Sequence, residues 1–168
     1  VAQARVFGVD LGKSHDYTVV VGLDDYGRVA YFDRFRQPWA TTLPRIAAAI
    51  GPQWALADST GVGDAIVEQL SLQLPLLSPF VFTATSKQQL MEQLAVALQQ
   101  HDICLPPADA NPILAELEVF EYRAGPTGRI QYAAPAGFHD DCVCALALAF
   151  RCYAQNRYRA SGFDYVLT

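Results

Sequence analysis

The sequence lacks any apolar run near the roughly 18 residues that a membrane-spanning helix needs. Its longest apolar run, Cys142–Phe150, is much shorter and is typical of a buried core helix. No signal peptide is recognisable at the N-terminus, and there are neither internal repeats nor low-complexity segments. These absences argue against a membrane protein and against a repeat architecture.

Charged residues are also scarce, at 17%, whereas hydrophobic residues make up 52% of the 168 residues. This composition and length predict one folded globular domain with a sizeable core. Because the chain begins at Val1 and not at Met, we expect a domain of a longer protein. The net charge of −5 argues mildly against a strong stand-alone nucleic-acid binder, but it is compatible with an acidic enzyme site that divalent metals neutralise.

No C-x-x-C pair is present among the four cysteines, so a zinc site is disfavoured. Three of them fall in one apolar helix, where a disulfide is geometrically disfavoured. We therefore expect free thiols and a reducing compartment. The cysteines are Cys104, Cys142, Cys144 and Cys152.

The first informative stretch is a buried strand that ends at Asp10. A buried carboxylate is costly unless it is compensated. Gly8 and Gly12 have no side chains, so we expect open space beside Asp10 that a cation such as a metal ion would fill. The alternative is that Asp10 only opens the loop after the strand, since Asp is a common turn residue.

Hydrophobic periodicity and turn residues predict an α/β fold. Three strands with short connections indicate an antiparallel meander, and strand–helix alternation after them requires parallel pairing. The expected architecture is a mixed five-stranded sheet with helices on both faces and a β-hairpin before the last long helix. The predicted elements are strands 4–11, 17–23 and 28–35, helix 42–50, strand 54–57, helix 64–74 with Asp64 as its cap, strand 80–82, helix 86–100, extended segment 103–105, helix 112–119, hairpin strands 120–123 and 129–132, and helix 139–157.

Three carboxylate sites meet in this arrangement. Asp10 and Asp58 end the first and fourth strands, which we expect to be parallel neighbours, so both acids lie at one sheet edge. Asp140 and Asp141 begin the apolar helix, where the helix dipole favours ionised acids, although such acids also simply cap helices. Carboxylate clusters suit Mg²⁺ or Mn²⁺. Two such ions about 4 Å apart activate water and stabilise the leaving oxygen in phosphodiester cleavage.

The ordered motifs resemble the nuclease domain of the large terminase subunit of tailed bacteriophages, a member of the RNase H-like superfamily. The resemblance extends from about residue 8 to residue 150, and each motif is weak alone. The matching segments are Gly8–Gly12 with Asp16–Thr18, Ala57–Gly63, Thr85–Lys87 before an amphipathic helix, Glu116-Leu117 with Phe120, and Gly137–Asp141 before the helix that contains Ala145–Ala149.

The resemblance implies a metal-dependent endonuclease that cuts concatemeric double-stranded viral DNA during packaging with two Mg²⁺ or Mn²⁺ ions. It implies that Asp10 bridges both ions, that Asp58 holds one, and that Asp140 or Asp141 holds the other. Helical neighbours point about 100° apart, so only one acid of this pair is expected to bind directly. His139 is either an outer or occasional ligand or a solvent-facing cap.

Several further residues are candidates for supporting roles. Asp16 would orient the metal ligands without binding an ion itself, or it is an ordinary loop residue. Lys87 opens a predicted helix, where a cation is disfavoured, which indicates a phosphate contact or a catalytic role; the alternative is a surface lysine. Lys13, Arg123 and Arg129 are candidate contacts to the DNA backbone, or solvated side chains.

The family also implies partners: an N-terminal ATPase domain of the same subunit, a small terminase subunit and a portal. It implies action in the host cytoplasm during virus assembly, without a membrane. The ATPase motif itself is absent, because the segment Gly8–Ser14 has three residues between its glycines where a phosphate loop has four.

Alternatives remain open at this point. A Holliday-junction resolvase or a transposase-like RNase H-fold nuclease would share the chemistry, and a non-catalytic RNase H-like binding module would keep the acids for structure. Sugar kinases and actin-like ATPases need a second duplicated domain, for which 168 residues leave no room. The Glu116-Leu117 segment and the predicted hairpin favour the terminase.

Overall fold

The computed structural model describes residues 3–12, 16–61, 63–106, 112–124, 130–133, 135 and 139–160. Within them, five strands form one mixed sheet in the order β3-β2-β1-β4-β5. The central strand β1 runs antiparallel to β2 and parallel to β4. The predicted meander and the predicted parallel pair are both confirmed, and the fold is RNase H-like. The strands are β1 Val6–Asp10, β2 Thr18–Leu23, β3 Val29–Phe35, β4 Trp54–Asp58 and β5 Leu77–Phe80.

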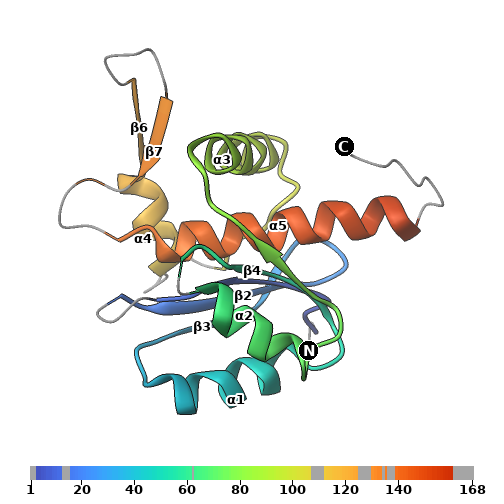
Figure 1. Ribbon diagram of the computed structural model, residues 1–168. Helices are drawn as coiled ribbons and strands as arrows, with labels where there is room; N and C mark the ends of the chain where they lie inside the picture. Colours follow the sequence, from blue (N-terminus) through green and yellow to red (C-terminus); the bar gives the residue numbers. More distant parts are fainter. Residues whose placement is uncertain are drawn as a thin grey trace.

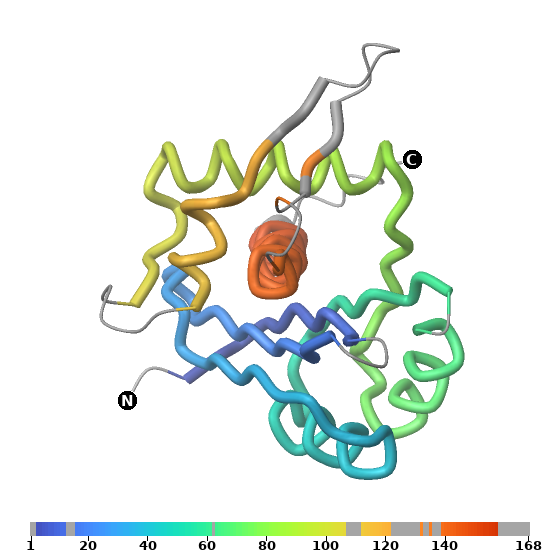
Figure 2. The backbone as a smooth tube through the Cα atoms, turned by 90° about the vertical axis from the view of Figure 1, so that its left-hand side faces the viewer, coloured from blue at the N-terminus to red at the C-terminus, as the bar shows by residue number. Residues whose placement is uncertain are grey.

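Helices cover both faces of this sheet (Figure 1). The helices α1 and α2 lie on one face, and α5 crosses the other face, with α3 beyond it and α4 beside its N-terminal part. Figure 2 shows α5 end-on between the sheet and α3. A separate hairpin, β6 Glu121–Ala124 with β7 Ile130–Ala133, projects from α4, as predicted. The helices are α1 Trp39–Ile50, α2 Gly63–Ser71, α3 Ala84–Gln99, α4 Pro112–Val119 and α5 Asp141–Ala160.

The two faces of the sheet contribute to two hydrophobic cores. Side chains alternate along a strand, so Val6 packs toward α5, whereas Phe7 and Val9 pack toward α1 and α2. Burial on both faces explains why β1 before Asp10 and β2 after Thr18 are apolar and do not alternate with polar residues.

The body of α5 is buried on every side, which confirms the prediction from its uncharged run. Its residues from Cys142 to Ala149 are at most 3% exposed. Gly8 of β1 makes this position possible, because a Cβ atom there would collide with the backbone of Ala145 and Ala149. A Cβ atom on Gly12 would likewise meet the backbone of Asp16 and Tyr17. The expectation that the two glycines leave room for a cation is therefore wrong: protein backbone fills that room.

Some element boundaries also differ from the prediction. The fifth strand is Leu77–Phe80, and not 80–82; it is an edge strand, where Pro79 is tolerated. Helix α3 begins at Ala84 because Thr83 caps it. The Thr83 hydroxyl accepts a hydrogen bond from the Ser86 backbone N–H, and the Ser86 hydroxyl accepts one from the Thr83 backbone N–H. Asp64 does not precede α2 but lies in its first turn.

None of the described helices combines the length and apolarity that a membrane crossing requires.

Candidate active site

The C-terminal ends of β1 and β4 bring the first two acids together. Val9 of β1 pairs with Ala57 of β4 in parallel register, so Asp10 and Asp58 occupy the next position on neighbouring strands. Asp58 is only 7% exposed. Its Oδ1 atom accepts a hydrogen bond of 2.8 Å from the Thr60 backbone N–H and a second one from the Thr60 hydroxyl. The loop after β4 thus holds the Asp58 carboxylate in place.

The N-terminus of α5 supplies the second pair of acids. Asp141 is the first residue of α5, and its Oδ2 atom is buried without a hydrogen-bond partner. The preceding residue, Asp140, has a different environment, because its Oδ2 atom lies 2.8 Å from Lys87 Nζ in an ion pair. The two adjacent acids therefore differ: Asp140 has a cationic partner, whereas one carboxylate oxygen of Asp141 has no hydrogen bond.

These carboxylates affect one another electrostatically. Burial raises the pKa of Asp10 well above its ordinary value, and repulsion by Asp141, Asp58 and Asp140 raises it further, against an opposing effect of Lys87. Burial, followed by the nearby Glu116, raises the pKa of Asp141 to about 6. Each of these two carboxyl groups thus disfavours its ionised form because of burial and because of its acidic neighbours.

Lys87 forms an ion pair with one of the four acids, Asp140. It lies in the first turn of α3, with its side chain half-buried. Burial lowers the pKa of Lys87, but Cys144, Asp140 and Asp10 outweigh burial, and the net shift is upward. The predicted proximity of Lys87 to the acids is therefore present in the structure.

His139 and Asp16 lie at the margin of the cluster. The Nδ1 atom of His139 is 3.6 Å from Asp141 Oδ2, and the side chain is 43% exposed. Its ring packs edge-on against Tyr17, with the ring centroids 5.6 Å apart. Asp16 is exposed and contributes to the raised pKa of Asp141. Both residues are near the acids, and neither is enclosed with them.

Comparison with known proteins gives the family. No protein-family model matches the chain. The large terminase subunit of Thermus phage G20c is 35% identical over 152 residues, which are 87% of this chain and 31% of that protein. A crystal structure of the G20c large terminase nuclease with bound magnesium is 34% identical, with a TM-score of 0.78, and the match covers 89% of this chain and 80% of that one.

The chain belongs to the large terminase nuclease family. The nuclease domain of Thermus phage P74-26 agrees, at 32% identity and a TM-score of 0.74 over 86% of this chain and 77% of that chain. The G20c nuclease is also similar in its forms with bound cobalt and with bound zinc, at TM-scores of 0.78 and 0.69. Our terminase nuclease spans about a third of the length of the curated relatives it matches, 31% in each case.

The acids of this terminase nuclease fit a divalent cation by their chemistry. Hard carboxylate oxygens are the ligands that such ions prefer, and Asp141 Oδ2 is a buried oxygen without a hydrogen bond. Among the residues that the structure describes, no three His, Cys, Asp or Glu side chains converge on one metal position. Two of the acids have other partners: Asp58 Oδ1 accepts hydrogen bonds from Thr60, and Asp140 is paired with Lys87. A cation would have to compete with these partners.

Other residues around the acids were not singled out as site residues by the sequence. Glu116 is buried on α4, Arg34 lies in β3 in register with Asp10 across β2, and Arg36 follows the end of β3. Both guanidinium groups pack on the Tyr17 ring, 4.1 and 4.5 Å from its centroid. A signal for Glu116 existed: it is three residues after Ile113, so it shares the apolar face of α4.

Of the three predicted DNA contacts, only Arg123 belongs to a described element. Lys13 and Arg129 fall outside the described residues. Arg123 lies in β6, but nothing is described of its side chain. These three assignments stay predictions.

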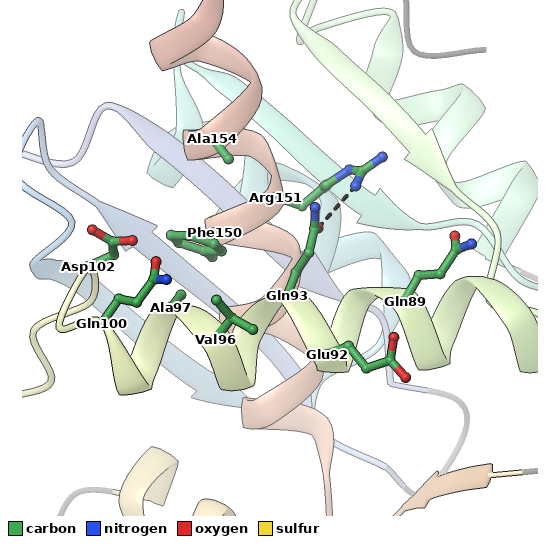
Figure 3. A pocket seen from close by; sticks show the side chains of 10 residues that line it. All are labelled: Gln89, Glu92, Gln93, Val96, Ala97, Gln100, Asp102, Phe150, Arg151 and Ala154. Carbon is green, nitrogen blue, oxygen red and sulfur yellow. Dashed lines mark hydrogen bonds between the residues drawn. The ribbon is translucent and has the colours of Figure 1, made fainter.

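Described residues line several surface cavities, and two of them differ in their position relative to the acids. One of about 390 Å³ lies beyond the C-terminal end of β1 and is lined by Gly12, Asp16, Thr18 and Arg36 among others. The other, of about 580 Å³, lies between α3 and α5, where Arg151 donates a hydrogen bond of 3.0 Å to Gln93 (Figure 3). Its α5 residues begin at Phe150, about 14 Å along the helix from Asp141 at 1.5 Å per residue, so it is separate from the acids.

Proposed function

We propose that this domain is the nuclease of a bacteriophage DNA-packaging motor. It would cut concatemeric double-stranded DNA by hydrolysis of phosphodiester bonds with two divalent ions, Mg²⁺ or Mn²⁺. The observation that carries the proposal is that Asp10 and Asp58 end neighbouring strands and interact electrostatically with the two acids at the start of α5, in a chain of the large terminase nuclease family.

Three carboxylates are the proposed metal ligands. Asp10 lies among the other acids and would bridge the two ions, Asp58 would hold one, and Asp141 the other. We prefer Asp141 to Asp140 as the direct ligand because its Oδ2 atom has no hydrogen bond, whereas Asp140 is paired with Lys87. His139 and Asp16 would support these ligands from the margin. The ions would activate water and stabilise the leaving oxygen.

The protein side chains would position the DNA strand beside the acids. Arg36 is exposed, follows the end of β3, and lines the cavity beyond the C-terminal end of β1 together with Asp16. Its guanidinium would bind a phosphate, and Lys87 would be a second cation within reach. Because the net charge is −5, strong DNA binding would come from the rest of the motor.

The motor context is part of the proposal. The remaining length of the related large subunits would contain the ATPase domain, and a small terminase subunit and a portal would be the other partners. The work would take place in the host cytoplasm during virus assembly. Double-stranded DNA is the proposed substrate, and the metal-bound structures of the G20c nuclease support a divalent ion as the cofactor.

The test is conversion of supercoiled plasmid to nicked and linear forms. Wild type, Asp10→Asn and Asp58→Asn are compared in Mg²⁺, Mn²⁺, Ca²⁺ and EDTA. We expect cleavage with Mg²⁺ or Mn²⁺, none in EDTA, and a loss of at least about a hundredfold in either variant. Metal-independent cleavage, or full activity of Asp10→Asn, would refute the two-metal assignment. A four-way junction cut much faster than the plasmid would favour a resolvase.

A further inference from the structure

Glu116 is a charged residue in a place where charged residues are rare. It lies on α4 and is only 7% exposed. Lone carboxylates are seldom buried, because loss of hydration disfavours the ionised form. Here the cost is offset by specific partners on two other elements, α5 and β3.

The first partner is the N-terminus of α5. Glu116 Oε2 accepts a hydrogen bond of 2.7 Å from the Cys142 backbone N–H, and the Val143 N–H lies 3.4 Å away. The first N–H groups of a helix have no partner within the helix, and a nearby side chain usually caps them. In this helix the acceptor comes from a residue 26 positions earlier, on a different helix. A carboxylate also interacts favourably with the positive end of the helix dipole.

The second partner connects Glu116 to the sheet. Its Oε1 atom lies 3.4 Å from Nη2 of Arg34, which is on β3. Arg34 packs on the ring of Tyr17, and Tyr17 contacts His139, the residue before the two acids. Glu116 therefore links α4, the sheet and both sides of the segment that contains Asp140 and Asp141.

We propose that Glu116 is a positioning residue of the nuclease site. By holding the Cys142 N–H, it fixes the first turn of α5 and hence the position of Asp141, one residue earlier. Glu116 does not touch the substrate or the ions in this role; it acts through the backbone of α5. The inference rests on the proposed function for its catalytic meaning, but its structural part stands on these contacts alone.

The test compares Glu116→Ala, Glu116→Gln and the control Glu118→Gln. Glu118 is exposed on the same helix. Glutamine keeps a carbonyl acceptor for the Cys142 N–H, whereas alanine removes it. Hydrogen exchange of the α5 amides, measured without metal, reports on the cap. Calorimetric titration with Mn²⁺ alone, well below the melting temperature, reports on the ligands.

We expect Glu116→Ala to lose protection at Cys142 and Val143 and to bind Mn²⁺ about 10–100-fold more weakly, the range seen when groups that orient ligands are removed. Glu116→Gln should recover most of the affinity, and Glu118→Gln should match wild type. If Glu116→Ala does not fold, Glu116→Gln and Glu116→Asp are compared, and Asp should be the weaker binder because its carboxylate is one methylene shorter.

Two results would overturn the proposal. One is unchanged protection of the Cys142 amide in Glu116→Ala. The other is lost protection with wild-type Mn²⁺ affinity, which would make Glu116 a cap that stabilises the fold and nothing more. Failure of the proposed function looks different: the wild type would bind Mn²⁺ with the predicted dependence on Glu116, and yet cut no DNA.

Discussion

Asp140 and Asp141 are neighbours in the sequence with different partners in space. Asp140 is paired with Lys87, and Asp141 has a buried oxygen without a hydrogen bond. We therefore expect Asp141→Asn to lose nearly all metal-dependent cleavage, by at least about a hundredfold, and Asp140→Asn to lose about tenfold or less. Plasmid nicking rates at saturating Mn²⁺ give the comparison. Equal losses in the two variants would mean that the partner of each acid does not decide its role.

The pH dependence of metal binding follows from the same residue. Burial and Glu116 raise the pKa of Asp141 to about 6 from an ordinary value of 3.8. The folded protein thus binds a proton that the unfolded chain has already released, so the stability of the metal-free protein falls as the pH rises from about 4 through 6.

A divalent ion needs the deprotonated carboxylate, so the predicted Mn²⁺ affinity rises as the pH increases through about 6. The raised pKa of Asp10 acts in the same direction. Calorimetric titrations between pH 5 and 7.5, in two buffers with different ionisation enthalpies, measure the affinity and the protons released. An affinity that does not change with pH, with no proton release, would contradict the prediction.

Among the elements, α5 and β1 depend on one glycine. The helix backbone packs directly on Gly8, where any Cβ atom would strike Ala145 and Ala149. Gly8→Ala should therefore reduce the free energy of unfolding by about 1–3 kcal/mol or more, since a helix backbone cannot move aside as a side chain can. Thermal unfolding measures the loss.

Gly22→Ala is the matched comparison for this prediction. It adds the same methyl group to the neighbouring strand β2, but the atoms it would meet belong to the side chains of Ala4 and Phe7. We expect a smaller loss of stability than for Gly8→Ala. The reverse order would show that the contact between β1 and α5 adjusts more readily than the packing around Phe7.

Local patterns were enough to predict most elements but not how they pack. Apolar strands ending in Asp10 and Asp58, and an uncharged helix after Asp141, are local signals, and they identified the strand order and the edge where the acids meet. Gly8 was misinterpreted because the helix that fills its space is far away in sequence. Glu116 was recognised only as part of a motif, because its bond to Cys142 depends on how two helices pack. The ion pair of Lys87 with Asp140 is equally a tertiary contact, across 53 positions.

At the scale of the whole molecule, the two ends of the strands differ in their exposed positive charge. The net charge is −5, but Arg36 lies exposed just after β3, at the end of the sheet that contains Asp10. Arg5, just before the opposite end of β1, is paired with Asp25. If Arg36 binds a phosphate, Arg36→Ala should weaken DNA binding and reduce the slope of log K against log salt by about 1.

Arg5→Ala is the control for this prediction, because it removes the same charge from the far end of the strand. Fluorescence anisotropy with a labelled duplex and Ca²⁺, over a range of salt concentrations, provides both slopes. Identical slopes for the two variants would show that DNA does not pass over the end of β3.

The burial of α5 also limits how the activity of such a nuclease could be regulated. Its first residue is a proposed ligand, and the residues that follow form the centre of the core. Moving the acids apart would therefore require opening the interior of the protein, which is a global event and too costly for a routine switch. In the proposed packaging role, restraint would therefore act on what reaches the acids, either the path of the DNA or the supply of ions. The acids would stay assembled, and access to them would be the part that varies.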